Sequence, residues 1–355
     1  MDDRDRIGAA YLSHLTQADL RELAHADEVS VTEAQGRIQA LHRAPGLLLD
    51  ILDRPTVSAG LLRLTAPDAS QRVTLISPFL AFAAAIHRIA ADLRTTGYSP
   101  ERTAPRQRVP VFDGPQLAAY LEEPAHRLFL AELLASFARS STGVVIMQTP
   151  HGPHRRRWND LDLSRLAMLL GALPEPERPP VWRRLGDLAL FLTGVFPAAL
   201  ERALAGRLDP VRLAKSTGLA EPPSAGLGPA ELFEWLGAGW YRLAASRTSG
   251  AAAATLAETV LGPGNLAAGD QQQRAPAQRE RRDGPADTWH GNSQSDQPEP
   301  GWASVGSAMS DPAAAAALLR DSAAHFHQAR RVLNAAADRY LFPVSVDWFT
   351  PPGLG

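Results

Sequence analysis

The sequence predicts a mostly α-helical protein: a compact helical domain with one or two small β-hairpins, a long disordered insert, and a C-terminal helix that docks back on the core. Three observations predict it. Helix-start signals recur along the chain, apolar residues recur at spacings of three and four, and residues 262–308 contain almost no aliphatic side chains. We expect residues 1–261 to form the domain, with a hairpin near 143–158. Residues 309–342 then form the C-terminal helix and 343–355 an irregular tail.

The helix starts combine a capping residue with a proline in the first helical position, where its missing N–H group costs no hydrogen bond. This pattern occurs at Ser77-Pro78, Asp209-Pro210 and Asp311-Pro312, and in a weaker form at Glu123-Pro124. The spacing of a capping box, in which two backbone N–H groups are satisfied reciprocally, occurs at Ser30 with Glu33 and at Thr16 with Asp19. So many helix starts favour an all-α class.

Between these starts, apolar residues recur with the period of a helix, as in Leu232, Trp235, Leu236, Trp240 and Leu243. Such a pattern turns one face of the helix inward. Gly237 and Gly239 fall inside it, and we interpret them as sites where two helices pack closely. Pro45, Pro115, Pro124 and Pro197 separate neighbouring helices, because the residue before a proline is steered out of the α region.

Two stretches predict strands. Residues 143–148 and 155–158, joined by a turn-rich segment at 149–154, predict a hairpin. Residues 61–64 and 72–76 suggest a second one. A lone hairpin is marginal in water, so each is expected to pack on a helix.

The segment 262–308 changes abruptly to Gly, Pro, Gln, Asp, Ser and Arg, which predicts a disordered linker. Trp289 and Trp302 stand out within it as conceivable partner contacts. After the linker, a seam of residues spaced by seven predicts a helix: Leu319, Phe326, Leu333 and Tyr340. We interpret it as one long helix docking on its own core, and a coiled-coil dimer is the alternative.

Composition excludes several classes of protein. Cysteine is absent, so disulfides, thiolate metal sites and Cys nucleophiles are excluded. The formal net charge of −2 argues against a nucleic-acid partner. The apolar runs 79–86 and 188–199 are too short to span a bilayer, and the acidic N-terminus does not have the form of a signal peptide. The expected protein is soluble and cytoplasmic, with no membrane partner.

Standard enzyme signatures do not occur: there is no GxSxG elbow, Walker A loop, HExxH motif or GxGxxG after a strand. Glu-x-x-His occurs at Glu22 with His25 and at Glu123 with His126, the spacing that di-iron bundles use. Such a site needs further inward glutamates, and Glu123 is expected to cap a helix. The sequence therefore predicts no metal and no cofactor.

Residues 213–219, LAKSTGL, resemble the first helix and turn of helix-turn-helix DNA-binding domains. The resemblance implies a DNA-binding regulator in which a recognition helix follows directly. Pro222 and Pro223 occupy the expected start of that helix, where they are poorly tolerated. DNA binding through this incomplete motif, near 209–227, is a third functional hypothesis.

Arginine clusters provide the candidate ligand-binding residues, because guanidinium groups bind carboxylate and phosphate groups in a bidentate manner. The candidates are Arg155, Arg156 and Arg157 on the predicted strand and Arg183 and Arg184 on a helix. Arg102, Arg106 and Arg108 are assigned to a proline-rich loop. The alternative is that these arginines are exposed and form surface ion pairs of little energy.

The candidates for proton transfer are Asp187, Asp113 and His87. Asp187 is expected to be buried and to pair with Arg183, Arg184 or residues 155–157, whereas the simpler interpretation of His87 is a half-buried side chain that donates to a carbonyl.

The leading hypothesis is a non-enzymatic interaction or regulatory protein with a protein partner, because catalytic signatures are missing and a linker with a seamed helix suits partner binding. The alternative is an enzyme or small-molecule-binding protein with an interhelical pocket for an anionic ligand, in which the arginine and proton-transfer candidates converge.

Overall fold

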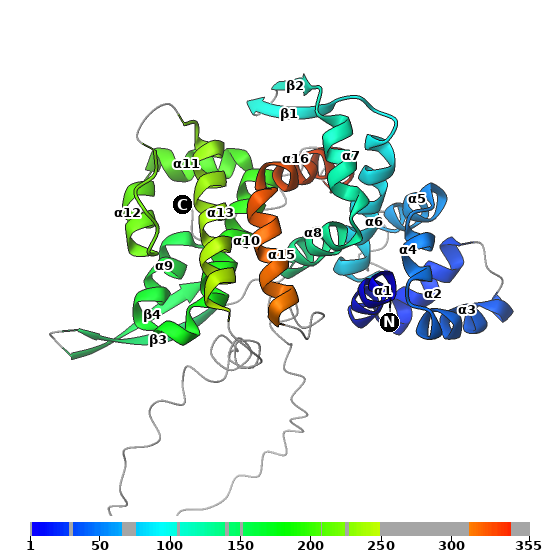
Figure 1. Cartoon of the computed structure of the whole chain (residues 1–355), viewed down its shortest axis with the longest axis horizontal. Coiled ribbons are helices and arrows are strands. Elements are labelled where there is room, and N and C mark those ends of the chain that lie inside the picture. The colour runs from blue at the N-terminus through cyan, green and yellow to red at the C-terminus, as the bar shows by residue number, and fades with distance from the viewer. Residues whose placement is uncertain are drawn as a thin grey trace, which may run out of the picture.

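The computed structural model is predominantly helical (Figure 1). It describes residues 2–27, 31–65, 76–104, 107–138, 142–149, 152–206, 208–223, 227–248 and 312–341. The predicted mostly α class is confirmed. The predicted linker, 262–308, and the tail, 343–355, lie outside the described residues. Among the described helices, none is both long and apolar enough to cross a membrane.

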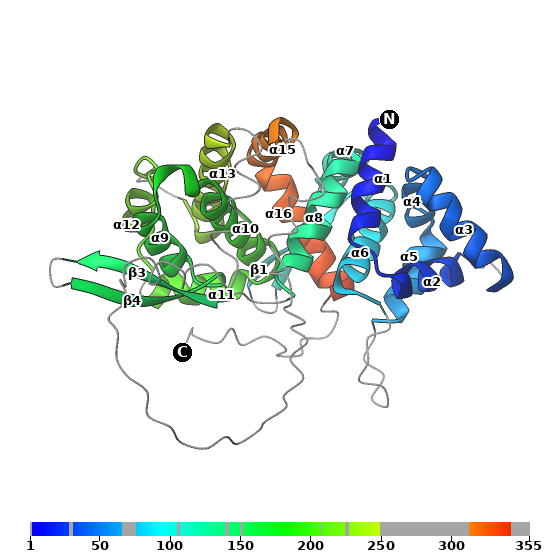
Figure 2. The same ribbon diagram turned by 90° about the horizontal axis from the view of Figure 1, so that it is seen from below.

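One end of the molecule is built from the first helices of the chain (Figures 1 and 2). They are α1 (Asp3–Ser13), α2 (Gln17–Ala26), α3 (Val31–Arg43), α4 (Leu47–Leu52) and α5 (Pro55–Arg63). Their apolar faces pack with α6 (Pro78–Leu93) and α8 (Pro124–Ser136) around a core that includes Tyr11, Leu48 and Leu80. We call this part the N-terminal lobe.

The other end is organised around α10 (Pro179–Val195). The remaining helices of this part are α7 (Gly114–Glu122), α9 (Leu163–Ala172), the 3-10 helix η1 (Glu175–Glu177), α11 (Pro197–Gly206), α12 (Pro210–Ser216) and α13 (Pro229–Arg247). Helices α10 and α13 pack along each other and bury Leu185, Phe233 and Trp240 completely. Residues of α6 and α8 contribute to the cores of both ends, which joins them into one body.

The helix starts follow the predicted capping chemistry. The Ser77 hydroxyl accepts a hydrogen bond from Leu80 N, and Asp209 accepts from Val211 N and Arg212 N. Glu123 accepts from Ala125 N, and Thr16 with Asp19 forms the predicted capping box. Ser30 and Asp311, the other two predicted caps, lie outside the described residues.

The predicted docking of the C-terminal helix on the core is confirmed, but this segment is not one helix. It consists of α15 (Pro312–Ala324), α16 (Phe326–Ala336) and a π-helical turn, η3 (Ala337–Leu341), which we together call the C-terminal arm. Its helix breaks at His325, where φ is −105° and ψ is 23°. The break lets α15 pack along α13 while α16 packs on α10 and β1, so each half follows a different neighbour (Figures 1 and 2).

Glycine allows the arm to approach the body closely. A Cβ atom on Gly237 of α13 would lie 2.4 Å from Cζ of Phe326. A Cβ atom on Gly194 of α10 would lie 2.7 Å from Cβ of Leu333. The predicted role of Gly237 in close helix packing is confirmed, and its neighbour is the arm.

The predicted hairpin near 143–158 is confirmed as β3 (Thr142–Thr149) and β4 (Gly152–Asn159), which pair antiparallel with Val144 opposite Arg157. Its strands extend further into the predicted turn than expected, up to Thr149 and from Gly152. The sheet ladder can include Pro153 because, in the part of the chain that the structure describes, each strand pairs only with the other.

One strand assignment and one loop assignment from the sequence are wrong, and the other strand of the second predicted hairpin, 72–76, lies outside the described residues except for Ile76. Residues 61–64 belong to the end of α5 and its C-cap, because their apolar pattern continues that of Val57 one turn earlier. A second hairpin does exist, but it is β1 (Ser99–Ala104) with β2 (Gln107–Val111), where a proline-rich loop was predicted. Arg102 pairs with Arg108 across it. The prolines fit because both strands are edge strands.

The segment that resembles a helix-turn-helix forms the short helix α12, which ends at Ser216 and is followed by Gly218 in the left-handed conformation, with φ of 81°. The next described helix is α13, which begins only at Pro229. The Thr217 carbonyl accepts a hydrogen bond from the Trp182 indole, and its hydroxyl accepts one from the Trp240 indole. The turn is therefore tied into the core, not presented to solvent.

Candidate functional site

The predicted ligand-binding arginines of α10 are engaged by the protein itself. Arg184 is buried, donates from Nη2 to Asp160 at 2.7 Å and from Nη1 to the Ser136 hydroxyl at 2.8 Å, and lies over the ring of Phe137. Burial lowers the pKa of Arg184, and the charge of Asp160 opposes that shift. This guanidinium therefore stabilises the fold and is shielded from solvent.

Asp187 is buried, as the sequence predicted, but its main partner was not predicted. The Tyr241 hydroxyl donates to its Oδ1 at 2.8 Å, whereas Arg183 Nε lies 3.9 Å from Oδ2. Burial raises the pKa of Asp187, and the charges of Arg183 and Arg184 oppose the shift. Tyr241 comes from α13, so the sequence spacing that suggested Arg183 could not reveal it.

The predicted ligand-binding arginines 155–157 lie on β4, a different element from the helix α10 that carries Arg183, Arg184 and Asp187. Arg157 is exposed, and its carbonyl accepts a hydrogen bond from Arg165. The side chains of Arg155 and Arg156 lie outside the described part of the structure, so the convergence of the two arginine clusters stays a prediction.

His87 lies in a buried chain of hydrogen bonds that we call the histidine network: Tyr11, Asp53, His87 and Arg127. Its Nδ1 is 2.7 Å from Asp53 Oδ1, and its Nε2 is 3.1 Å from the Tyr11 hydroxyl. Arg127 donates to the same oxygen of Asp53 at 2.9 Å. The His87 side chain is completely buried, not half-buried, and its partners are a carboxylate and a hydroxyl, not a carbonyl.

The charges of the histidine network are set by burial. Burial lowers the pKa of His87, so the ring is neutral; its Nδ1–H donates to Asp53, and Nε2 accepts from Tyr11. For Asp53, burial raises the pKa, but the hydrogen bond from His87 and the charge of Arg127 outweigh burial and lower it. His87 and Tyr11 are fully buried in the N-terminal lobe, and Asp53 reaches the edge of the lobe with 28% of its side chain exposed.

The third candidate for proton transfer, Asp113, belongs to a junction between the C-terminal arm and the body. Arg331 of α16 is 1% exposed. It donates from Nε to Asp113 Oδ2 at 2.8 Å and from Nη2 to the Ser99 hydroxyl at 2.6 Å. The hydrogen bonds from Arg331 and Ser99 outweigh burial and lower the pKa of Asp113. This carboxylate is held as an anion for Arg331.

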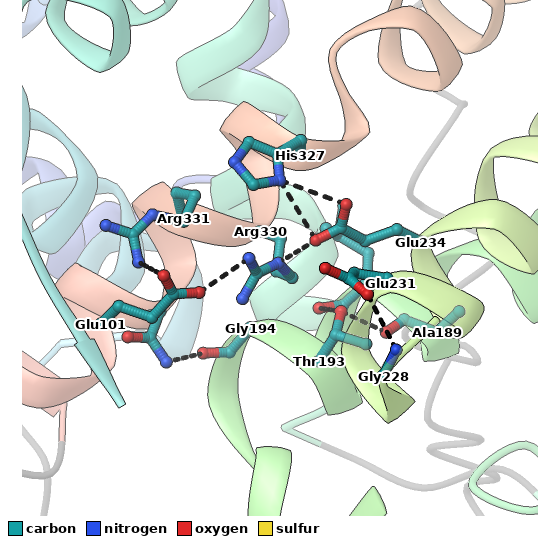
Figure 3. A network of polar contacts seen from close by, with 12 residues as sticks. Glu101, Ala189, Thr193, Gly194, Gly228, Glu231, Glu234, His327, Arg330 and Arg331 are labelled. Atoms are coloured by element: carbon teal, nitrogen blue, oxygen red, sulfur yellow. Dashed lines mark hydrogen bonds and ion pairs between the residues drawn. The ribbon is translucent and has the colours of Figure 1, made fainter. Parts of the chain in front are cut away.

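Neighbouring groups extend this junction toward α13 (Figure 3). Arg330 donates from Nη2 to Glu101 Oε1 at 3.0 Å, and Arg331 Nη1 lies 3.1 Å from Glu101 Oε2. On its other side, Arg330 forms an ion pair with Glu234, whose Oε2 lies 3.2 Å from Nδ1 of His327. We call this set the arginine junction: Ser99, Glu101, Asp113, Glu234, His327, Arg330 and Arg331.

Sequence reasoning missed the arginine junction. Its carboxylates lie 93 to 230 positions before their partners in the arm, so spacing carries no information on the pairing. A signal was present: Arg330 and Arg331 stand between Phe326 and Leu333 of the seam. Charged residues that interrupt an inward-facing helix are rarely buried without a partner.

The β1–β2 hairpin carries exposed apolar side chains. Phe112 is 82% exposed, and Tyr98 and Val109 are also exposed. The rings of Tyr98 and Phe112 contact edge-to-face, with 6.3 Å between centroids. Tyr98 directly precedes β1 and Phe112 directly follows β2, and we call these two residues the hairpin patch. Figure 1 shows the hairpin at the top of the body, beside α7 and above α16.

The hairpin is held from below by the arm. Arg108 of β2 donates from Nε to Asp338 at 2.6 Å and from Nη2 to the same carboxylate at 3.1 Å. Glu101 of β1 binds both arginines of the junction. Both strands are therefore fixed to the C-terminal arm.

A final cluster combines His126 of α8 with Asp321 and His325 of the arm. His126 Nε2 contacts Asp321 Oδ2, and His325 Nδ1 lies 3.0 Å from Asp321 Oδ1. One ligand atom from each of these residues can be chosen so that all three lie within 4.8 Å of one another. Asp321 and His325 are four residues apart and therefore lie on one face of the helix, but neither was among the predicted site residues.

Comparison of the chain with protein-family models, with curated proteins and with solved structures gave no match.

Proposed function

We propose that the protein is a non-enzymatic interaction or regulatory protein and that it binds a protein partner through the hairpin patch. The observation that carries the proposal is the exposure of Phe112, 82%, in contact with a second exposed aromatic ring. Single exposed apolar residues are common on proteins, whereas adjacent aromatic rings are typical of binding hot spots. A partner would bury both rings.

The support beneath the patch favours binding. Arg108 holds β2 through two hydrogen bonds to Asp338, and Glu101 holds β1 through Arg330 and Arg331. A surface that is already ordered loses little conformational entropy when a partner binds. Among the described strands, β1 and β2 pair only with each other, so an extended partner segment can add hydrogen bonds at an outer edge.

The buried candidates give less support to an enzyme. Arg184 and Asp187 have protein partners inside the core, and His87 is closed within the N-terminal lobe. A ligand-binding arginine or a general base must reach its substrate, and these groups would first have to leave their present partners.

A photo-crosslinking experiment tests the proposal. The full chain carries a photoreactive phenylalanine analogue at position 112 or, as a control, at position 211, because Val211 is exposed on α12, away from the hairpin. In extract of the native cell, a discrete crosslinked protein should form from position 112 and not from 211. Tyr98→Ser should reduce it. Equal crosslinking from both positions, or none from 112, would overturn the proposal.

A further inference from the structure

The cluster of His126, Asp321 and His325 has the composition of a metal site. Two imidazole nitrogens and one carboxylate oxygen are the ligands that zinc and related divalent transition metals prefer. In tetrahedral zinc sites the ligand atoms lie about 2.0–2.2 Å from the ion. The three side chains already bring such atoms together, and a small outward movement of the contacting pairs makes room for an ion.

The surroundings of His126 orient it for this role. Its Nδ1 lies 2.6 Å from the carbonyl of Tyr120, in the last turn of α7, where carbonyl groups lack a helical partner. A hydrogen on Nδ1 satisfies this carbonyl. A metal-binding histidine commonly donates its second N–H group to a carbonyl in the same manner, because this fixes the tautomer and the ring. The ring of Tyr120 also stacks on His126, with 4.1 Å between centroids.

The contact between His126 and Asp321 also supports a cation at this position. With its hydrogen on Nδ1, a neutral His126 presents the lone pair of Nε2 to a carboxylate oxygen of Asp321. Two lone pairs face each other only if a cation, either a proton or a metal ion, lies between them. His325 adds a further nitrogen on the other oxygen of the same carboxylate.

We propose that His126, Asp321 and His325 bind one divalent transition metal ion of the zinc class. The sequence predicted no metal. It offered His126 only together with Glu123, in a Glu-x-x-His motif, and Glu123 caps α8. The side chains of Asp321 and His325 are 40% and 42% exposed, so the ion would face solvent on one side and keep a coordination position for water. Because the ligands come from α8 and from the arm, the ion would join the arm to the body.

Metal titration of the full chain tests this proposal. The protein is stripped with a chelator and titrated with Zn²⁺ by calorimetry and with Co²⁺ by visible absorption. We expect one ion per chain and the strong visible bands of four-coordinate Co²⁺. Asp321→Asn and His325→Gln should each weaken binding at least about tenfold, because each removes one ligand. Both residues are half-exposed, so these variants should fold.

Two controls separate this site from ordinary surface histidines. His327→Gln changes a more exposed histidine two residues further along, which pairs with Glu234, and it should leave metal affinity unchanged. Zn²⁺ should raise the melting temperature of the wild type but not that of His325→Gln, because a ligand that binds only the folded state stabilises it. Failure to bind Zn²⁺ and Co²⁺, or equal affinity in His325→Gln and His327→Gln, would overturn the proposal. Neither outcome bears on the hairpin patch.

Discussion

The histidine network and the arginine junction are both polar and centred on fully buried side chains, those of His87 and Arg331, but they connect different parts of the chain. The histidine network links α1, α6, α8 and the C-cap of α4, all within the first 136 residues. The arginine junction links β1, the N-cap of α7 and α13 to an arm that returns after residues 249–311, which the structure does not describe. One network lies within a continuous stretch, and the other joins distant segments.

The two clusters also differ in the number of charged groups that they contain. The histidine network centres on a neutral ring, and one arginine, Arg127, balances Asp53. The arginine junction sets two guanidinium groups against Glu101, Asp113 and Glu234. Buried ion pairs contribute little net stability, but removing one partner is costly. The junction therefore serves mainly to specify where the arm docks, and its single substitutions should have the larger effects.

The largest expected effect is that of Arg331→Met. The change keeps an apolar stem but leaves Asp113 and Ser99 without their guanidinium partner, so the free energy of unfolding should fall by about 3–5 kcal/mol. Urea unfolding measures it. Adding Asp113→Asn should restore part of the loss, because it removes the uncompensated carboxylate. Arg339→Ala, on the same arm but at 3.5 Å from Asp92 and partly exposed, should cost under about 1 kcal/mol. Similar losses in the two arginine variants would contradict the proposed role of the junction.

The next largest loss of stability is expected where the C-terminal arm packs on α13 through apolar contacts. Gly237→Ala places a methyl group 2.4 Å from the ring of Phe326, so the arm must shift. We expect the free energy of unfolding to fall by about 3 kcal/mol, near the upper end of the range for overpacked cores. Gly171→Ala is the matched control, since nothing lies within 4 Å of its Cβ position in α9. This control should be neutral or stabilising, because alanine favours helix. Equal thermal unfolding of the two variants would show that the arm does not pack here.

A smaller loss is expected in the histidine network. Asp53→Asn keeps a hydrogen-bond acceptor for one donor but removes the charge that faces Arg127. We expect the free energy of unfolding, measured with urea, to fall by about 2 kcal/mol. Asp50→Asn is the control, because Asp50 is more exposed and pairs with Arg4 at the surface. A loss as large as that of Arg331→Met would remove the distinction between the two networks.

Local sequence features predicted the elements, and distant pairings explain what the sequence did not predict. Ser77, Thr16 and Asp209 reveal helix starts because a cap acts within four residues. The break at His325 and the partner of Asp187 depend on packing against other helices, which no local spacing records.

The candidate sites likewise depend on pairings between distant segments, which local spacing does not record. Asp113 and Asp187 were named as candidates for proton transfer, but their partners are residues far along the chain, Arg331 and Tyr241. Asp321 with His325 is a further pairing that helical spacing could have revealed, since four residues separate them on one face.

The smallest expected effect is the pH dependence that His87 adds. Its pKa is lowered from the ordinary value of 6.5 because burial disfavours the charged ring, which Arg127 disfavours further, although Asp53 opposes the shift. The unfolded chain therefore binds a proton at a higher pH than the folded one does. Stability from this group is present above about pH 6.5 and is lost as the pH falls from there toward the lower folded pKa. Urea midpoints at pH 7.5 and 5.5 should differ more in the wild type than in His87→Gln, whatever the variant loses at both values. His25→Gln, which changes an exposed histidine, should keep the wild-type difference. If His87→Gln also keeps it, the ring is not held neutral by burial, and the electrostatic contrast between the two networks is wrong.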